Sequence, residues 1–83
     1  MANGTTDVKL SRPIKANGVE VSELRMREPV VNDQLVMEEM SGSDALKELA
    51  MIANLCQVAP DDLKQLTLRD YKKVQKAFVG FIG

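Results

Sequence analysis

The residues of this sequence that could carry chemistry favour structural roles over catalysis. Asp61 and Asp62 form an adjacent carboxylate pair, the residue type used in general acid–base catalysis, but they follow Pro60 at the expected start of a helix. Acidic side chains at that position usually stabilise the positive end of the helix dipole. Cys56 is expected on an apolar helix face, where a thiol is normally buried and unreactive.

Composition excludes several classes of function. The chain has no histidine and a single cysteine, so neither histidine-based catalysis, nor a soft metal site, nor an internal disulfide framework is expected. Nucleotide-binding and nucleophile motifs are also missing from the sequence. We therefore expect no enzymatic activity and no cofactor or metal.

Charge and hydropathy indicate a cytoplasmic protein that binds neither nucleic acid nor membranes. The net charge of the 83 residues is −1, so no strong field attracts polyanions. No apolar run approaches the roughly 20 residues needed to cross a bilayer, and the N-terminus lacks the apolar segment of a signal peptide.

The expected fold class is α+β, with an N-terminal β-hairpin followed by a small bundle of three to four short helices. Residues 1–7 are expected to be a flexible N-terminus, and residues 8–83 a single domain with a hairpin over 8–27 and a helical part over 30–82. Apolar residues alternate on both sides of Asn17-Gly18, which is typical of a two-residue hairpin turn.

The second strand contains a change in alternation that predicts a β-bulge. Apolar side chains stand at odd positions up to Val21 and at even positions from Leu24, so an extra residue is expected near Ser22-Glu23. In the resulting register Ile14 lies opposite Val21, and Leu10 lies opposite Met26.

This register places basic residues together on the exposed face of the hairpin. Arg25 and Arg27 share that face with Lys9, which falls nearly opposite Arg27. Because like charges across a ladder destabilise it, an acidic group is expected nearby. It is either Glu38 or Glu39 of the same chain or an acidic partner protein.

Four helical segments follow the hairpin, and three of them have recognisable N-caps. The expected helices are 33–40 after Asn32, 44–57 after Ser43, a short helix from Pro60, and 68–82 after Thr67.

The helix over 44–57 also suggests a surface for a partner. Met51 and Leu55 project away from the expected core side, which carries Leu46, Leu49 and Ile52. Either the hairpin or the first helix covers them, or they are left bare, and we expect them to be at least partly exposed. Should they be buried instead, Phe81 near the C-terminus is the next candidate. The residues expected to bind a partner are therefore Arg25, Arg27, Met51, Leu55 and Phe81.

A helix-turn-helix DNA-binding regulator is the alternative function. The second and third helices are joined by the turn VAPDD, which places Asp61 and Asp62 at the head of the recognition helix. Carboxylates at that position repel the phosphates of DNA.

The ordered motifs of the chain resemble one family of phage proteins. L-x-x-P-I over residues 10–14, Gly18, LRMREP over 24–29 and Asp33 are followed by ALKELAMIANLCQVAPDDLKQLTLRDYKKV. This set is similar to the tail assembly chaperones of Mu-like contractile-tailed phages, the group named E, 41 or 14. The similarity covers roughly residues 8–78.

The resemblance implies a role in building a phage tail. It implies that the chain binds the tape measure protein in the host cytoplasm and assists assembly of the tail tube. It also implies that the chain is absent from the mature virion and needs no cofactor. The tail tube protein and a second copy of the chain are further expected partners.

Overall fold

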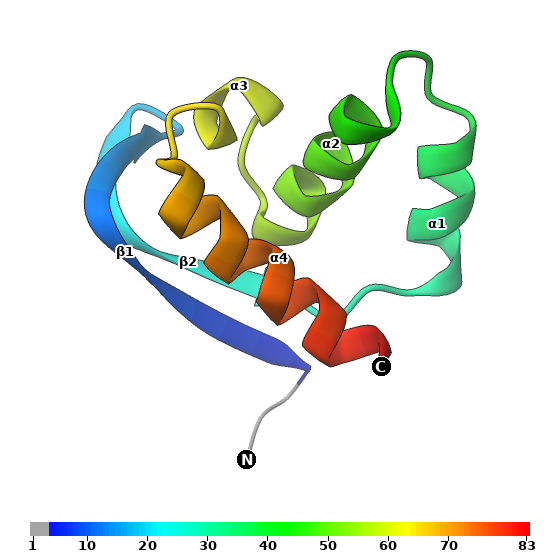
Figure 1. The fold of residues 1–83 in the computed structure, drawn as a ribbon, viewed down its shortest axis with the longest axis horizontal. Helices are drawn as coiled ribbons and strands as arrows, with labels where there is room; N and C mark the ends of the chain where they lie inside the picture. The colour runs from blue at the N-terminus through cyan, green and yellow to red at the C-terminus, as the bar shows by residue number, and fades with distance from the viewer. Residues whose placement is uncertain (1–3) are drawn as a thin grey trace.

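The computed structural model describes residues 4–83 and shows a hairpin packed against helices (Figure 1). In chain order the elements are β1 (Thr5–Ala16), β2 (Val19–Arg27), α1 (Val31–Glu38), α2 (Asp44–Cys56), α3 (Pro60–Leu63) and α4 (Leu68–Ile82). The predicted α+β class is confirmed. β1 begins at Thr5, so part of the segment expected to be flexible belongs to a strand; residues 1–3 lie outside the described residues.

The hairpin turn is the one that the sequence predicts. Asn17 and Gly18 both have positive φ angles, 56° and 79°, as a two-residue turn requires. The strands are antiparallel, and Ile14 lies opposite Val21 as expected.

The predicted β-bulge near Ser22-Glu23 of β2 is replaced by extra residues in β1, on the strand opposite. Between the pairs Lys9–Glu23 and Ile14–Val21, β1 has four residues where β2 has only Ser22. Pro13 lies in this stretch of β1 and has no N–H to donate to a ladder. The prediction that Leu10 lies opposite Met26 is therefore wrong, because Thr6 takes that place.

A side chain of α4 holds the irregular part of β1 in place. The carboxylate of Asp70 accepts the backbone N–H of Ser11 at 3.0 Å and the hydroxyl of Ser11 at 3.1 Å. It also accepts the backbone N–H of Arg12 at 3.4 Å. The amides that leave the ladder thus find a new acceptor, which allows β1 to carry extra residues.

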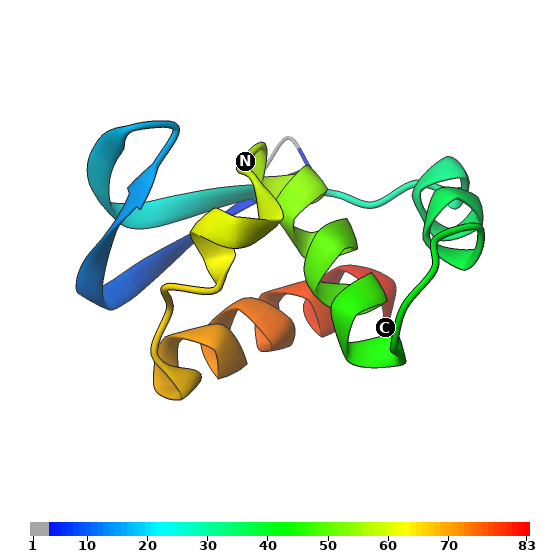
Figure 2. The ribbon, with the colours of Figure 1, turned by 90° about the horizontal axis from the view of Figure 1, so that it is seen from above.

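The core lies between one face of the hairpin and the helices α2, α3 and α4. α4 packs against β1 and α2 packs against β2 (Figures 1 and 2). The fully buried apolar side chains at the centre are Met26, Ile52, Leu55, Leu63 and Val74. They come from both the hairpin and the helices, so neither part has a complete core alone.

α1 is the outlying element. It packs mainly against α2, at the opposite end of the molecule from the hairpin turn (Figures 1 and 2). It begins at Val31, and not after Asn32 as expected, because Asp33 accepts the backbone N–H of Val30 at 2.8 Å and so satisfies a helix-terminal donor.

The other predicted caps are confirmed. The Ser43 hydroxyl accepts the N–H of Leu46 at the start of α2, and the Thr67 hydroxyl accepts the N–H of Asp70 at the start of α4. These local hydrogen bonds fix where two helices begin.

Candidate functional site

An apolar groove lies between α1, α2 and the C-terminal part of α4. We call it the helical groove. Its volume is about 590 Å³. Its apolar lining residues are Pro29, Val30, Val31, Met37, Met51, Phe78 and Ile82, and its polar ones are Gln34, Asp44, Lys47 and Glu48.

Large apolar side chains remain open to solvent around this groove. Val31 is 75% exposed, and Ile82 is 62% exposed. On α1, Leu35 and Val36 are also exposed, although they do not line the groove. Apolar side chains that gather on one surface commonly mark a protein-binding site.

Met51 and Leu55 are buried, so the prediction that they are at least partly exposed is wrong. Met51 is 6% exposed and lies at the base of the helical groove, whereas Leu55 is 1% exposed and belongs to the core. The reason is that α2 is covered from several sides, by α1, by the hairpin and by α3. The placement of Leu46 on the core side is also wrong, because this residue of the first turn of α2 is 51% exposed.

Arg27 connects the end of β2 to the start of α1. Its guanidinium donates to both carboxylate oxygens of Asp33, at 2.9 and 2.8 Å. The hydrogen bond from Arg27 lowers the pKa of Asp33 below its ordinary value, against the opposing effect of burial. This bidentate pair neutralises Arg27 within the chain, and it ties the end of β2 to the start of α1, which forms one wall of the helical groove.

Arg25 lies on the exposed face of the hairpin and pairs with Asp7. Its Nε donates to the Asp7 carboxylate at 2.9 Å. Lys9 lies opposite Glu23, and not Arg27, so the predicted repulsion between like charges is absent from this face. The prediction that Glu38 or Glu39 lies beside the arginines is also wrong, because Arg25 pairs with Asp7 and Arg27 pairs with Asp33.

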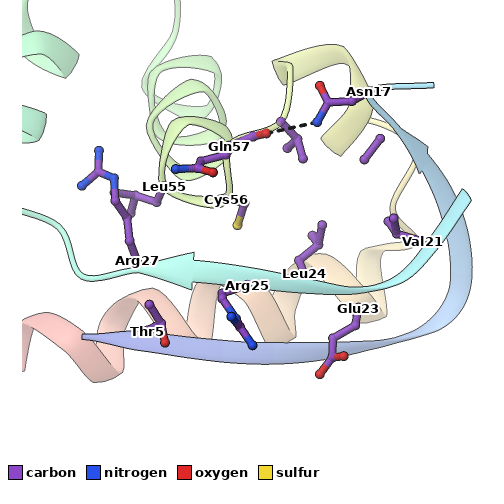
Figure 3. Close-up of a pocket in the computed structure, with 12 residues that line it drawn as sticks. Thr5, Asn17, Val21, Glu23, Leu24, Arg25, Arg27, Leu55, Cys56 and Gln57 are labelled. Atoms are coloured by element: carbon purple, nitrogen blue, oxygen red, sulfur yellow. Dashed lines mark hydrogen bonds between the residues drawn. The ribbon is translucent and has the colours of Figure 1, made fainter. Parts of the chain in front are cut away.

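A second hollow, which we call the edge groove, lies between β2 and the C-terminal end of α2. Its volume is about 370 Å³. Arg25, Arg27 and Leu55 line it, and Figure 3 shows Leu55, Cys56 and Gln57 facing the strand that carries the arginines.

The structure therefore does not gather the five predicted partner-binding residues at one site. The edge groove is lined by Arg25, Arg27 and Leu55, whereas Met51 lies under the helical groove. Phe81 is partly buried against the core, next to the groove-lining Ile82.

The sequence analysis missed Val30, Val31 and Ile82 as candidates. A signal was present in the segment VVNDQLVMEEM, whose apolar residues surround α1 and do not form a single stripe. A helix that is apolar on more sides than its neighbours cover leaves some of that surface exposed.

Cys56 and Asp62, which were considered above for chemistry, have structural roles. Burial raises the pKa of the Cys56 thiol to about 11. The Asp62 carboxylate accepts the N–H groups of Ala59 and Asn17, both at 3.2 Å. Across residues 4–83, no group of three or more His, Cys, Asp or Glu side chains is arranged to hold a metal ion.

Two further observations bear on the kind of partner. α3, which would be the recognition helix of a helix-turn-helix, spans only Pro60–Leu63 and begins with acidic residues. In the described part of the chain, no helix has the length and apolar character needed to cross a membrane.

Comparison with known proteins identifies the family. Searches of curated proteins and of solved structures gave no significant match. A family described as phage tail assembly chaperone proteins, E, or 41 or 14, matches residues 7–83, which is nearly the whole chain. The chain therefore belongs to this family of phage tail assembly chaperones.

Proposed function

We propose that this tail assembly chaperone binds the tape measure protein of its phage, and that the helical groove is the binding site. The observation that carries the proposal is the exposed apolar surface of α1 and the end of α4 around a groove of about 590 Å³. Family membership supports the general role in tail assembly, and the groove offers a surface for a tail component.

The shape and lining of the groove favour a helical ligand. A tape measure protein is a long helical chain with repeated apolar stripes, and an amphipathic helix binds by laying its apolar face in a groove between helices. Met37 and Met51 line the groove. Methionine side chains adapt to varied partners, which suits a chaperone that meets many segments of one long chain.

The proposal includes the finer features that the family resemblance implies. The chain acts in the host cytoplasm, has no catalytic activity, and leaves before the virion is complete. The tail tube protein and a second copy of the chain are proposed as additional partners.

A matched pair of variants tests the proposal by co-expression with the tape measure protein of the same phage. Val31 and Leu68 are each the first residue of a helix and are 75% and 79% exposed, but only Val31 lines the helical groove. Val31→Asp should reduce co-purification by about tenfold or more, and Leu68→Asp should leave it unchanged. An acidic residue in the first turn favours a helix, so neither variant should unfold.

Two results would contradict the proposal. If the wild-type chain does not co-purify with the tape measure protein, that protein is not the partner. If Val31→Asp and Leu68→Asp bind equally well, the helical groove is not the site.

A further inference from the structure

The outer edge of β2 presents unpaired backbone groups. The N–H of Glu28 donates to the carbonyl of Gly4 at 2.6 Å, which makes these two residues a hydrogen-bonded pair of the antiparallel ladder. Because hydrogen-bonded and non-hydrogen-bonded pairs alternate, the backbone groups of Arg27, Arg25 and Glu23 point away from β1. Among residues 4–83 the sheet has two strands only, so no third strand takes up these groups.

The edge groove is lined by the residues that carry these backbone groups. It is lined by Glu23, Leu24 and Arg25, consecutive residues that belong to both faces of β2, and also by Thr5 and Ala16 of β1. A hollow lined from both faces of a strand lies at the edge of that strand. The end of α2, with Leu55 and Cys56, provides the opposite wall (Figure 3), and Val58 just after the helix also lines it.

The charges on β2 specify the kind of strand that could bind there. Asp7, Val8 and Lys9 of β1 run antiparallel to Glu23, Leu24 and Arg25 of β2, so that each charge faces its opposite. β1 thus pairs an acid–apolar–base sequence with the inner edge of β2. The Arg25 side chain is 71% exposed despite its ion pair with Asp7, so it can receive a second carboxylate from the outer side.

We propose that the outer edge of β2 binds an extended segment of another protein as a third, antiparallel strand, and that this segment carries an acid–apolar–base sequence. Its acidic residue lies beside Arg25, its basic residue beside Glu23, and its apolar residue between Leu24 and the end of α2. Backbone hydrogen bonds provide affinity in this mode of recognition, and alternate side chains provide specificity. This site is separate from the helical groove and does not depend on the tape measure proposal.

The probe for this proposal is a synthetic peptide with the sequence of residues 5–11, TTDVKLS, added to the isotope-labelled full-length chain. The control peptide exchanges its acidic and basic residues. The first peptide at millimolar concentration should shift the backbone amide signals of Glu23, Arg25 and Arg27 and slow their hydrogen exchange. The control should bind about five- to tenfold more weakly, since it places like charges side by side.

A variant that combines Glu23→Lys and Arg25→Glu with Lys9→Glu and Asp7→Lys reverses the charges of the edge while each cross-strand pair stays opposite in sign, and it should reverse the preference between the two peptides. Absence of any effect at these amides, or equal binding of both peptides to the wild-type chain, would overturn the proposal. If the same amides become protected as the chain alone is concentrated, the edge binds a second copy, and the proposed occupant is wrong.

Discussion

Removing the carboxylate of Asp33 should detach α1 while the core remains folded. Asp33→Ala removes two hydrogen bonds from Arg27, at 2.9 and 2.8 Å, a long one from Asn54 at 3.5 Å, and the acceptor for the N–H of Val30. A hydrogen bond to a charged group contributes about 1.5–3 kcal/mol, and a helix cap contributes about 1 kcal/mol. Because the Arg27 side chain is 36% exposed, we take about 2 kcal/mol for the pair and about 3 kcal/mol in all.

Hydrogen exchange at neutral pH measures this change residue by residue. A loss of about 3 kcal/mol should raise the opening constant of α1 about 100-fold, up to the exchange rate of an unfolded chain. Amides of α4 should change much less, because α4 packs mainly against the hairpin and not against α1. Equal acceleration in both helices would show that α1 unfolds only with the core. Unchanged exchange in α1 would show that the carboxylate contributes nothing.

The stabilisation of α1 by the Asp33 carboxylate should weaken in acid. Hydrogen bonding to Arg27 lowers the pKa of Asp33 in the folded chain below the ordinary value of 3.8. The stabilisation is therefore fully present above pH 3.8 and is lost as the pH falls through the lower, folded value. The protection factors of the α1 amides, which correct for the intrinsic pH dependence of exchange, should fall in that acid range in the wild-type chain, whereas Asp33→Asn should show no such step.

Three further predictions concern the core and its buried polar groups. Leu55→Ala should lower the free energy of unfolding by about 2–5 kcal/mol in urea titrations, and Leu68→Ala by less than about 0.5 kcal/mol; similar values would contradict the assigned burial. The backbone N–H of Ser11 lowers the pKa of Asp70, so Asp70→Asn should reduce Tm above pH 3.8 and lessen the fall in Tm below it, whereas parallel pH profiles would refute the assignment. Burial raises the pKa of Cys56 to about 11, so iodoacetamide at about pH 8 should modify the native thiol far more slowly than the urea-unfolded one, and equal rates would contradict this.

Features fixed by neighbouring residues could be predicted from the sequence. Ser43 and Thr67 accept N–H groups three residues further along the chain, so the starts of α2 and α4 follow from short motifs. The turn at Asn17-Gly18 likewise depends on two residues that tolerate positive φ. The order of hairpin and helices follows from such local signals.

Features fixed by distant residues could not be predicted in this way. The irregularity in β1 depends on Asp70, which is 59 positions from Ser11, so the alternation in β2 alone placed the extra residues on the wrong strand. Met51 is buried because α1 lies beside α2, and the position of α1 depends on the bond between Arg27 and Asp33. The candidate site is formed by three helices and was therefore found only in the structure.

Site-specific photo-crosslinking tests the proposed role of the helical groove most directly. A photoreactive amino acid placed at position 31 lies in the groove, and the same group at position 68 is equally exposed but lies outside it. In cells that co-express the tape measure protein, irradiation should join that protein to the chain labelled at position 31 and not to the chain labelled at position 68. Crosslinks from position 68 alone, or from neither position while the two proteins still co-purify, would contradict binding in the groove.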